Sequence, residues 1–172
     1  YKAYTEQMRQ QFGLKSVFDV VGNHGAPSFD MPEDQPKFGE LYDLEGNLVA
    51  DHQNLEPEQL DPDNPLHQFY HQNKDIMQLS NLHENNPGLQ DYLINSYLYW
   101  IEQGADAFRI DTIKHVPHHF WKTMADRVRA EHPDFYMFGE SFSFEANFIA
   151  QHTLPKNGNI SVLDFPGREA MT

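Results

Sequence analysis

The chain has 172 residues, which is enough for one domain with a sizeable core. Its 12 basic and 26 acidic residues give a formal net charge of −14 without any run of Lys or Arg, which argues against nucleic acid and anionic membranes as partners. The absence of cysteine excludes disulfides and thiolate metal sites, and no apolar stretch approaches the ~20 residues that span a membrane. A neutral sugar polymer is compatible with so acidic a protein.

The first part of the chain predicts a helix, a strand and a long insertion. Residues 1–12 carry apolar side chains at helical spacing, and Gly13 is expected to end that helix. Residues 16–21 are rich in Val and Phe and predict a strand. Residues 25–86 are rich in Pro, Asn, Asp, Gln and His and have no sustained period. A segment of that length is typical of a lid or an inserted subdomain.

After the insertion, helices and strands alternate. Asn86 as N-cap and Pro87 begin a helix that ends at Gly104, Val116-Pro117 begins a second, and Pro166 begins a last one. Another helix is expected near 144–151, and strands are expected at 105–111, 135–140 and 160–165. This order predicts β/α units on a parallel sheet. Only four strands are recognisable, which is half of an eight-stranded barrel, so we expect two open edges.

Charged residues cluster where two of these strands end. Side chains alternate along a strand, so Arg109 and Asp111 share one face, and the guanidinium favours an ionised Asp111. Glu140 ends the next strand. A retaining glycosidase needs one carboxylate that attacks the sugar carbon and a second carboxyl that protonates the leaving oxygen. Taken singly, Asp111 is equally compatible with a helix N-cap, and Glu140 with a surface carboxylate.

Three segments resemble conserved regions of the α-amylase superfamily of glycoside hydrolases. Residues 19–24 (Asp-Val-Val-Gly-Asn-His), 104–115 (with Arg109-Ile-Asp111) and 138–140 (Phe-Gly-Glu) are similar to its first, second and third regions. Residues 39–43 (Gly-Glu-Leu-Tyr-Asp) and the pair 164–165 (Asp-Phe) are most similar to the branch of cyclodextrin glycosyltransferases and bacterial α-amylases. The resemblance covers essentially the whole chain.

The resemblance implies an α/β fold that is part of a (β/α)₈ TIM barrel, about strands 3 to 6. Residues 1–24 would supply the end of barrel helix 2 and strand 3, and residues 87–172 would supply helix 3 to strand 6. Residues 25–86 would form the inserted domain B. In such barrels the chemistry lies at the C-terminal ends of the strands.

The resemblance also implies a role for each matching residue. Asp111 is then the nucleophile, Glu140 the general acid/base, and Arg109 the cation that keeps Asp111 ionised. Substrate contacts are implied at His24, which would hydrogen-bond the sugar being cleaved, and on the acceptor side at Lys114, His115 and Phe142. Read alone, His24 is an ordinary loop histidine, the pair 114–115 is a solvated turn, and Phe142 fits a core equally well.

A structural calcium ion is implied as well. Its ligands would be the side chains of Asn23 and Asn81 and the backbone carbonyl of His115, because oxygen atoms suit this hard cation. The family usually has Asp where this chain has Asn81, which lowers the charge of the site by one. The other histidines show no metal-site spacing, and His118 and His119 are expected to be exposed on the outside of the barrel.

The function expected is a retaining glycosidase that cleaves α-1,4 linkages of starch or malto-oligosaccharides. An α-1,4-glucan transglycosylase is the alternative, although Met77 stands where the cyclising branch has an aromatic residue. The family's fourth region, with its catalytic Asp, is not recognised within these 172 residues. We therefore expect little or no turnover by this chain alone, with weak oligosaccharide binding as the non-catalytic alternative. Self-association through open barrel edges and a secreted or periplasmic location complete these expectations.

Overall fold

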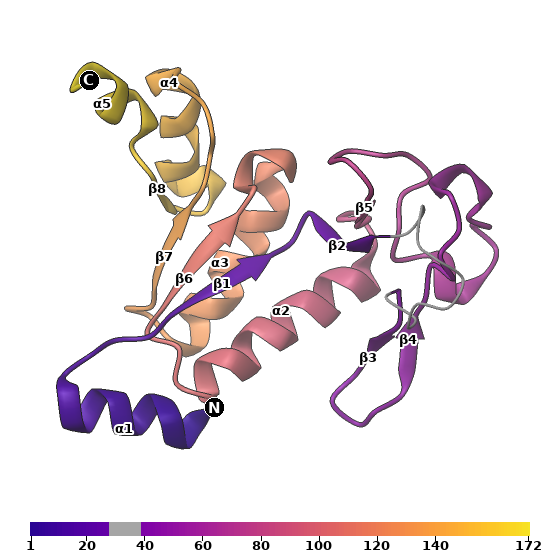
Figure 1. The fold of residues 1–172 in the computed structure, drawn as a ribbon, viewed down its shortest axis with the longest axis horizontal. Coiled ribbons are helices and arrows are strands. Elements are labelled where there is room, and N and C mark those ends of the chain that lie inside the picture. The colour runs from indigo at the N-terminus through magenta and orange to yellow at the C-terminus, as the bar shows by residue number, and fades with distance from the viewer. Residues whose placement is uncertain (28–38) are drawn as a thin grey trace. The chain divides into compact units, whose positions relative to one another are not determined.

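The structure is a computed structural model that describes residues 1–27 and 39–172 (Figure 1). It divides into two compact units, one formed by residues 1–22 and 93–172 and the other by residues 23–92. The sequence analysis placed the insertion at 25–86, and its residues 28–38 lie outside the described ranges. The second unit thus begins two residues earlier and includes the first turns of the helix α2, Pro87–Glu102.

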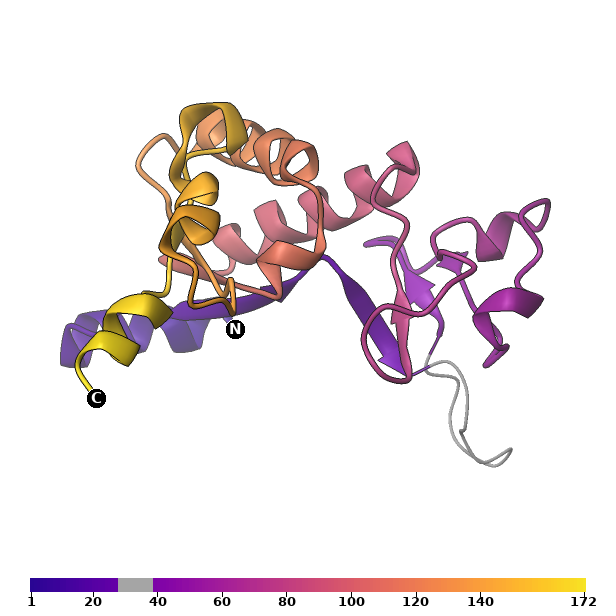
Figure 2. The same ribbon diagram turned by 90° about the horizontal axis from the view of Figure 1, so that it is seen from above.

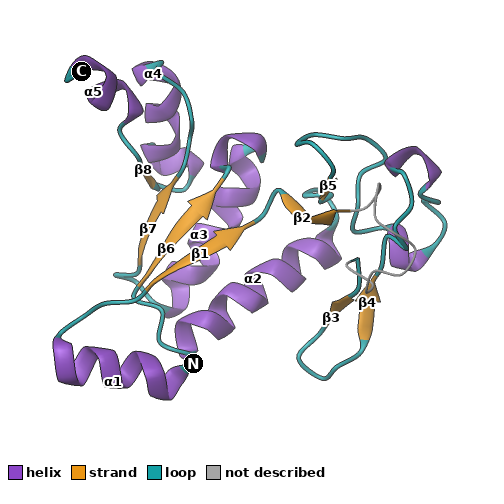
Figure 3. Cartoon of the chain, viewed as in Figure 1, coloured by secondary structure: helices purple, strands orange, loops and turns teal. Residues whose placement is uncertain are grey.

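The first unit contains a parallel sheet of four strands in chain order, β1-β6-β7-β8 (Figure 3). The strands are β1 Val17–Val21, β6 Ala107–Asp111, β7 Tyr136–Gly139 and β8 Ser161–Val162. Helix α3, His118–Glu131, connects β6 to β7, and α4, Ala146–Ile149, lies between β7 and β8. Parallel neighbours joined by helices are the β/α units that the sequence predicted, so the α/β class is confirmed.

Helices α2 and α3 cover one side of this sheet (Figure 2). Helix α3 has a stripe of fully buried side chains, formed by Phe120, Trp121, Met124 and Val128. Tyr97 of α2 packs its ring 5.9 Å from that of Phe108, and Trp121 Nε1 donates to the carbonyl of Ile113 at 2.9 Å. No helix within the described ranges is long and apolar enough to cross a membrane.

The predicted helix ends follow their local signals. Asn86 Oδ1 accepts hydrogen bonds from the backbone N–H groups of Gly88 and Leu89 and so caps α2. The helix α1, Lys2–Phe12, ends at Gly13, which has φ 64°. Strand β8 is shorter than predicted because the Asp164 side chain accepts from Gly167 N at 2.8 Å. That bond begins α5, Phe165–Ala170, and draws the chain out of the sheet.

Helix α1 is attached to the loop that precedes β6. Thr5 is buried, and its Oγ1 donates to the carbonyl of Gln103 at 2.9 Å. Gly104 has φ 104°, and a Cβ atom there would lie 2.0 Å from Thr5 Oγ1. Arg9 and Asp106 form an ion pair at 2.9 Å on the same side. Glycine at 104 is therefore required both by the backbone angle and by the close approach of α1.

The second unit has two small antiparallel ladders. Strand β2, His24–Pro27, pairs with β5, Leu79–Asn81, and β3, Leu41–Tyr42, pairs with β4, Leu48–Ala50. Short 3₁₀ turns cover Pro57–Gln59 and Pro65–His67. Hydrogen bonds between side chains and backbone hold the unit together, such as Tyr70 Oη to the carbonyl of Gly39 at 2.7 Å. This explains why no hydrophobic period is visible in its sequence.

Candidate active site

The candidate site lies where β1, β6 and β7 end in the first unit. Asp19 of β1 lies opposite Arg109 of β6, and Arg109 lies opposite Phe138 of β7. The backbone N–H of Glu140 donates to the carbonyl of Ile110 at 2.8 Å, so Glu140 follows directly on the paired part of β7. Three neighbouring strands thus bring Asp19, Arg109 and Glu140 to one place.

One guanidinium contacts three carboxylates at these strand ends. Arg109 Nη1 donates to Asp111 Oδ1 at 2.6 Å and to the Asp19 oxygens at 3.0 and 3.1 Å. Its Nη2 lies 2.8 Å from Glu140 Oε2. Arg109, Asp111 and Glu140 are about a quarter exposed (24%, 22% and 28%), whereas the Asp19 side chain is 62% exposed. The site is therefore open to solvent on the side of Asp19.

The electrostatics of the cluster keep Arg109 positively charged. Burial acts to lower the pKa of its guanidinium. The hydrogen bonds to Asp111 and Asp19 and the negative charges of Asp19 and Glu140 outweigh burial and raise that pKa. A single permanent cation thus organises all three carboxylates.

Only part of this cluster follows from the sequence. Strand alternation predicts that Arg109 and Asp111 share a face, and the structure joins them. Glu140 is predicted at a neighbouring strand end, but its ion pair with Arg109 is not. Asp19 was missed as a site residue. The available signal was its position as the first charged residue of a strand that could pair beside β6.

The predicted acceptor-side residues lie beyond β6 and β7 in the first unit. Lys114 and His115 are exposed in the 3₁₀ turn Ile113–His115. Lys114 Nζ donates to the carbonyl of Phe142 at 2.6 Å and lies 5.9 Å from the centre of its ring. Phe142 is 53% exposed and packs edge to face with Phe165 at 5.0 Å, so it is not a core residue in this structure.

The predicted site residues of the second unit contact other residues of that unit. His24 in β2 lies opposite Asn81 in β5. Asn23 is buried, and its Nδ2 donates to Asp75 Oδ2 at 2.8 Å. Asn81 Nδ2 donates to the carbonyl of Asn73 at 3.3 Å. Both amide nitrogens are thus bonded to oxygen, and Asp75 adds a carboxylate that the sequence analysis did not include.

One prediction about histidines is wrong. His119 is exposed, but His118 packs its ring 4.7 Å from the ring of His152, and its Nδ1 is buried. The error arose because the 3₁₀ turn Ala150–Thr153, which carries His152, packs against the start of α3, and the sequence period of α3 alone does not reveal this. Among the described residues, no group of three or more His, Cys, Asp or Glu side chains could hold a metal ion.

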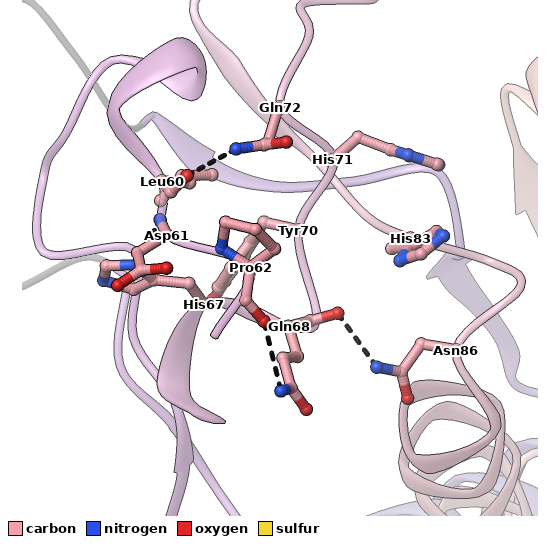
Figure 4. A pocket seen from close by; sticks show the side chains of 10 residues that line it. All are labelled: Leu60, Asp61, Pro62, His67, Gln68, Tyr70, His71, Gln72, His83 and Asn86. Carbon is pink, nitrogen blue, oxygen red and sulfur yellow. Dashed lines mark hydrogen bonds between the residues drawn. The ribbon is translucent and has the colours of Figure 1, made fainter. Parts of the chain in front are cut away.

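A pocket of about 350 Å³ lies in the second unit (Figure 4). Its polar lining groups bond mostly to one another: Gln72 Nε2 donates to the carbonyl of Leu60, Gln68 Nε2 to that of Pro62, and Asn86 Nδ2 to that of Gln68. His71 Nε2 lies 2.7 Å from Glu84 Oε2. These contacts fix the walls of the pocket and indicate a structural role for its polar side chains.

Comparison with known proteins decides the family. Residues 2–169 match the model of the α-amylase catalytic domain. The chain belongs to this family. It is 28% identical over 167 residues to the cyclomaltodextrin glucanotransferase of Bacillus licheniformis, and 31% identical over 172 residues to that of Niallia circulans. These matches cover 89% and 88% of the chain but 22% of each relative.

Similarity to solved structures confirms the fold. The crystal structure of an Anoxybacillus α-amylase matches with a TM-score of 0.68 at 23% identity, over 98% of this chain and 34% of that one. The α-amylase-family chain is thus part of a (β/α)₈ barrel, as the sequence predicted. It spans about a fifth of the length of its curated relatives.

Proposed function

We propose that this chain carries the nucleophile and the acid/base of a retaining glycosidase that acts on α-1,4-linked glucans. The observation that carries the proposal is the guanidinium of Arg109, which holds Asp111 and Glu140 at the C-terminal ends of neighbouring parallel strands. Membership of the α-amylase family supports an α-glucan as substrate. In barrels of this kind, residues at those strand ends carry the chemistry.

In the proposed reaction, Asp111 attacks the anomeric carbon while Glu140 gives its proton to the departing glycosidic oxygen. The C–O bond to the leaving sugar breaks, and a covalent glycosyl-enzyme forms on Asp111. Glu140, now a base, takes a proton from water, and that water breaks the ester bond to Asp111. Two displacements at the same carbon return the original α configuration.

The contact between Glu140 and Arg109 has a consequence for this mechanism. A general acid must carry a proton, whereas an ion pair with a guanidinium favours the ionised carboxylate. We infer that a bound sugar separates Glu140 from Arg109, which frees the Glu140 carboxyl to face the glycosidic oxygen. Arg109 would remain on Asp111, the closer of the two contacts.

Transfer to a second sugar is the alternative outcome of the same chemistry. It is favoured by the relatives named cyclomaltodextrin glucanotransferase and by the exposed ring of Phe142, which could receive an acceptor sugar beside Lys114. Hydrolysis is favoured by Met77, which replaces an aromatic residue of the cyclising branch. The products distinguish them: transfer gives cyclic or longer glucans, and hydrolysis gives shorter ones only.

We further propose that Asn23, Asp75 and Asn81 hold a calcium ion. Their oxygens are hard donors that suit this cation, and the carboxylate of Asp75, at 2.8 Å from Asn23 Nδ2, supplies the negative charge that Asn81 lacks. When bound, the ion would stabilise this part of the chain and take no part in bond cleavage.

Turnover of maltoheptaose by this chain, with the anomers of the first products followed by NMR, tests the proposal. Glu140→Gln is the critical variant, and Glu145→Gln, an exposed carboxylate nearby, is its control. First products in the α configuration, lost in Glu140→Gln alone, support the retaining mechanism, and β products contradict it. If this chain is inactive while a longer protein that contains it is active, the chain by itself is a non-catalytic fragment.

A further inference from the structure

A buried polar pair lies directly behind Glu140. Ser141 is fully buried, and its hydroxyl lies 3.2 Å from Nε2 of His152, which is 3% exposed. His152 comes from the 3₁₀ turn Ala150–Thr153, and its backbone carbonyl accepts from Ile160 N at 3.0 Å just before β8. The pair thus connects the residue after Glu140 to the segment that leads into the next strand.

The pair is buried, and other rings pack against the imidazole of His152. The ring of His118 packs edge to face on His152 at 4.7 Å, and Phe148 lies at 6.4 Å. Burial, with a smaller effect of His118, lowers the pKa of His152 to about 4. Burial and the charge of Lys156 lower the pKa of His118 too. Both rings are therefore neutral near pH 7, and a neutral imidazole can hydrogen-bond the serine hydroxyl without a buried charge.

Glu140 and Ser141 point in different directions. Glu140 is partly exposed and contacts Arg109, whereas the adjacent Ser141 is completely buried. Successive side chains of an extended segment project to opposite sides. A bond that fixes Ser141 on the inside therefore fixes the direction of Glu140 on the outside. Buried polar groups need such partners, so loss of the bond would leave Ser141 free to reorient.

We propose that His152 is a positioning residue for Glu140, acting through Ser141. It rests on the proposed function in assigning Glu140 as the acid/base, but the geometric claim is independent of turnover. His152 does not touch substrate in this proposal. It holds the end of β7 so that, before a sugar binds, the Glu140 carboxylate lies at the guanidinium of Arg109.

The test is the distance from Glu140 Oε2 to Arg109 Nη2, which is 2.8 Å here, measured in crystal structures of variants of the whole chain. His152→Phe keeps a ring but removes its nitrogens, Ser141→Ala removes the hydroxyl, and His152→Gln restores an amide that can bond Ser141. His119→Phe is the control because His119 is exposed. Circular dichroism shows which variants are folded.

We expect this distance to exceed about 4 Å, beyond an ion pair, in His152→Phe and in Ser141→Ala, because the end of β7 is then no longer held. His152→Gln should restore the contact, and His119→Phe should leave it unchanged. An unchanged contact in either folded variant overturns the proposal, and so does a failure of His152→Gln to restore it. If His152→Phe does not fold, Ser141→Ala decides. Absence of turnover would contradict the proposed function without altering this result.

Discussion

The Arg109 guanidinium donates to the Asp111 carboxylate across 2.6 Å within a single strand. The contact exists because residues two apart on a strand face the same side. Strand pairing then brings Asp19 from β1 and Glu140 from the end of β7 to the same cation. The arrangement of these three carboxylates at the strand ends therefore depends on one side chain, that of Arg109.

Replacement of Arg109 by Met should destabilise the first unit by about 1–3 kcal/mol at pH 7, since it leaves three carboxylates without their cation. Urea unfolding at pH 7 measures this loss. Arg9→Met is the matched control, because Arg9 forms a more exposed ion pair with Asp106 and should cost less than ~1 kcal/mol. Equal losses in the two variants would contradict a special role of Arg109 in holding the three carboxylates.

Gly104→Ala should lower the free energy of unfolding much more than Gly13→Ala does. Both glycines have positive φ, 104° and 64°, so both substitutions strain the backbone by about 1–2 kcal/mol. Only at Gly104 would the new Cβ meet another residue, Thr5, with Oγ1 at 2.0 Å. We expect an additional loss of about 1–3 kcal/mol and faster amide exchange in α1. Comparable exchange in the two variants would show that α1 is not attached through Thr5.

Much of the fold could be predicted because it has local causes. The helix ends at Gly13 and Asn86 depend on residues within one turn, and the buried stripe of α3 follows the helical period. The contact between Arg109 and Asp111 follows from strand alternation. These features involve neighbours in the sequence, so their signals survive in the sequence alone.

The contacts that were missed depend on pairing between distant segments. Asp19 and Arg109 are 90 residues apart, and only the register of β1 on β6 brings them together. His118 and His152 meet through the packing of two helical segments. Strand register is set by tertiary packing and not by local composition, so the sequence could place the carboxylates at strand ends but not name the contacts between them.

Calcium should raise the melting temperature if Asn23, Asp75 and Asn81 bind it. A ligand present at a hundred times its dissociation constant stabilises the folded state by about 2.7 kcal/mol. Asn23→Leu should abolish this gain, because it removes the buried amide that contacts Asp75. Asn85→Leu, at an exposed position, should retain it. Thermal unfolding with calcium and with EDTA gives the comparison, and an equal gain in both variants would place the ion elsewhere.

Thr112 follows Asp111 and has φ 48°, a left-handed conformation that a β-branched residue rarely adopts. Thr112→Gly should therefore be at least as stable as Thr112→Ala, in contrast to the usual order. Thr123 in α3 is the control, since in a helix glycine is about 1 kcal/mol worse than alanine. Chemical unfolding of the four variants tests this. The same order of Gly and Ala at both positions would mean that no strain is stored beside Asp111.

His152 should make the chain less stable in mild acid. Burial first, and then His118, lowers its pKa from 6.5 to about 4 in the folded state. The unfolded chain therefore takes up the proton first as the pH falls, so stability is lost between pH 6.5 and about 4, by up to ~3 kcal/mol.

His152→Leu removes that proton uptake, although it also loses the bond to Ser141 and starts from a lower stability at pH 7. Its free energy of unfolding relative to wild type should therefore improve on acidification, whereas that of His119→Leu, altered at an exposed site, should stay constant. Because each variant is compared with wild type at the same pH, the titration of the other acidic groups largely cancels. A constant difference for His152→Leu would mean that the imidazole takes up its proton at the same pH in the folded and unfolded chain, which its burial beside His118 opposes.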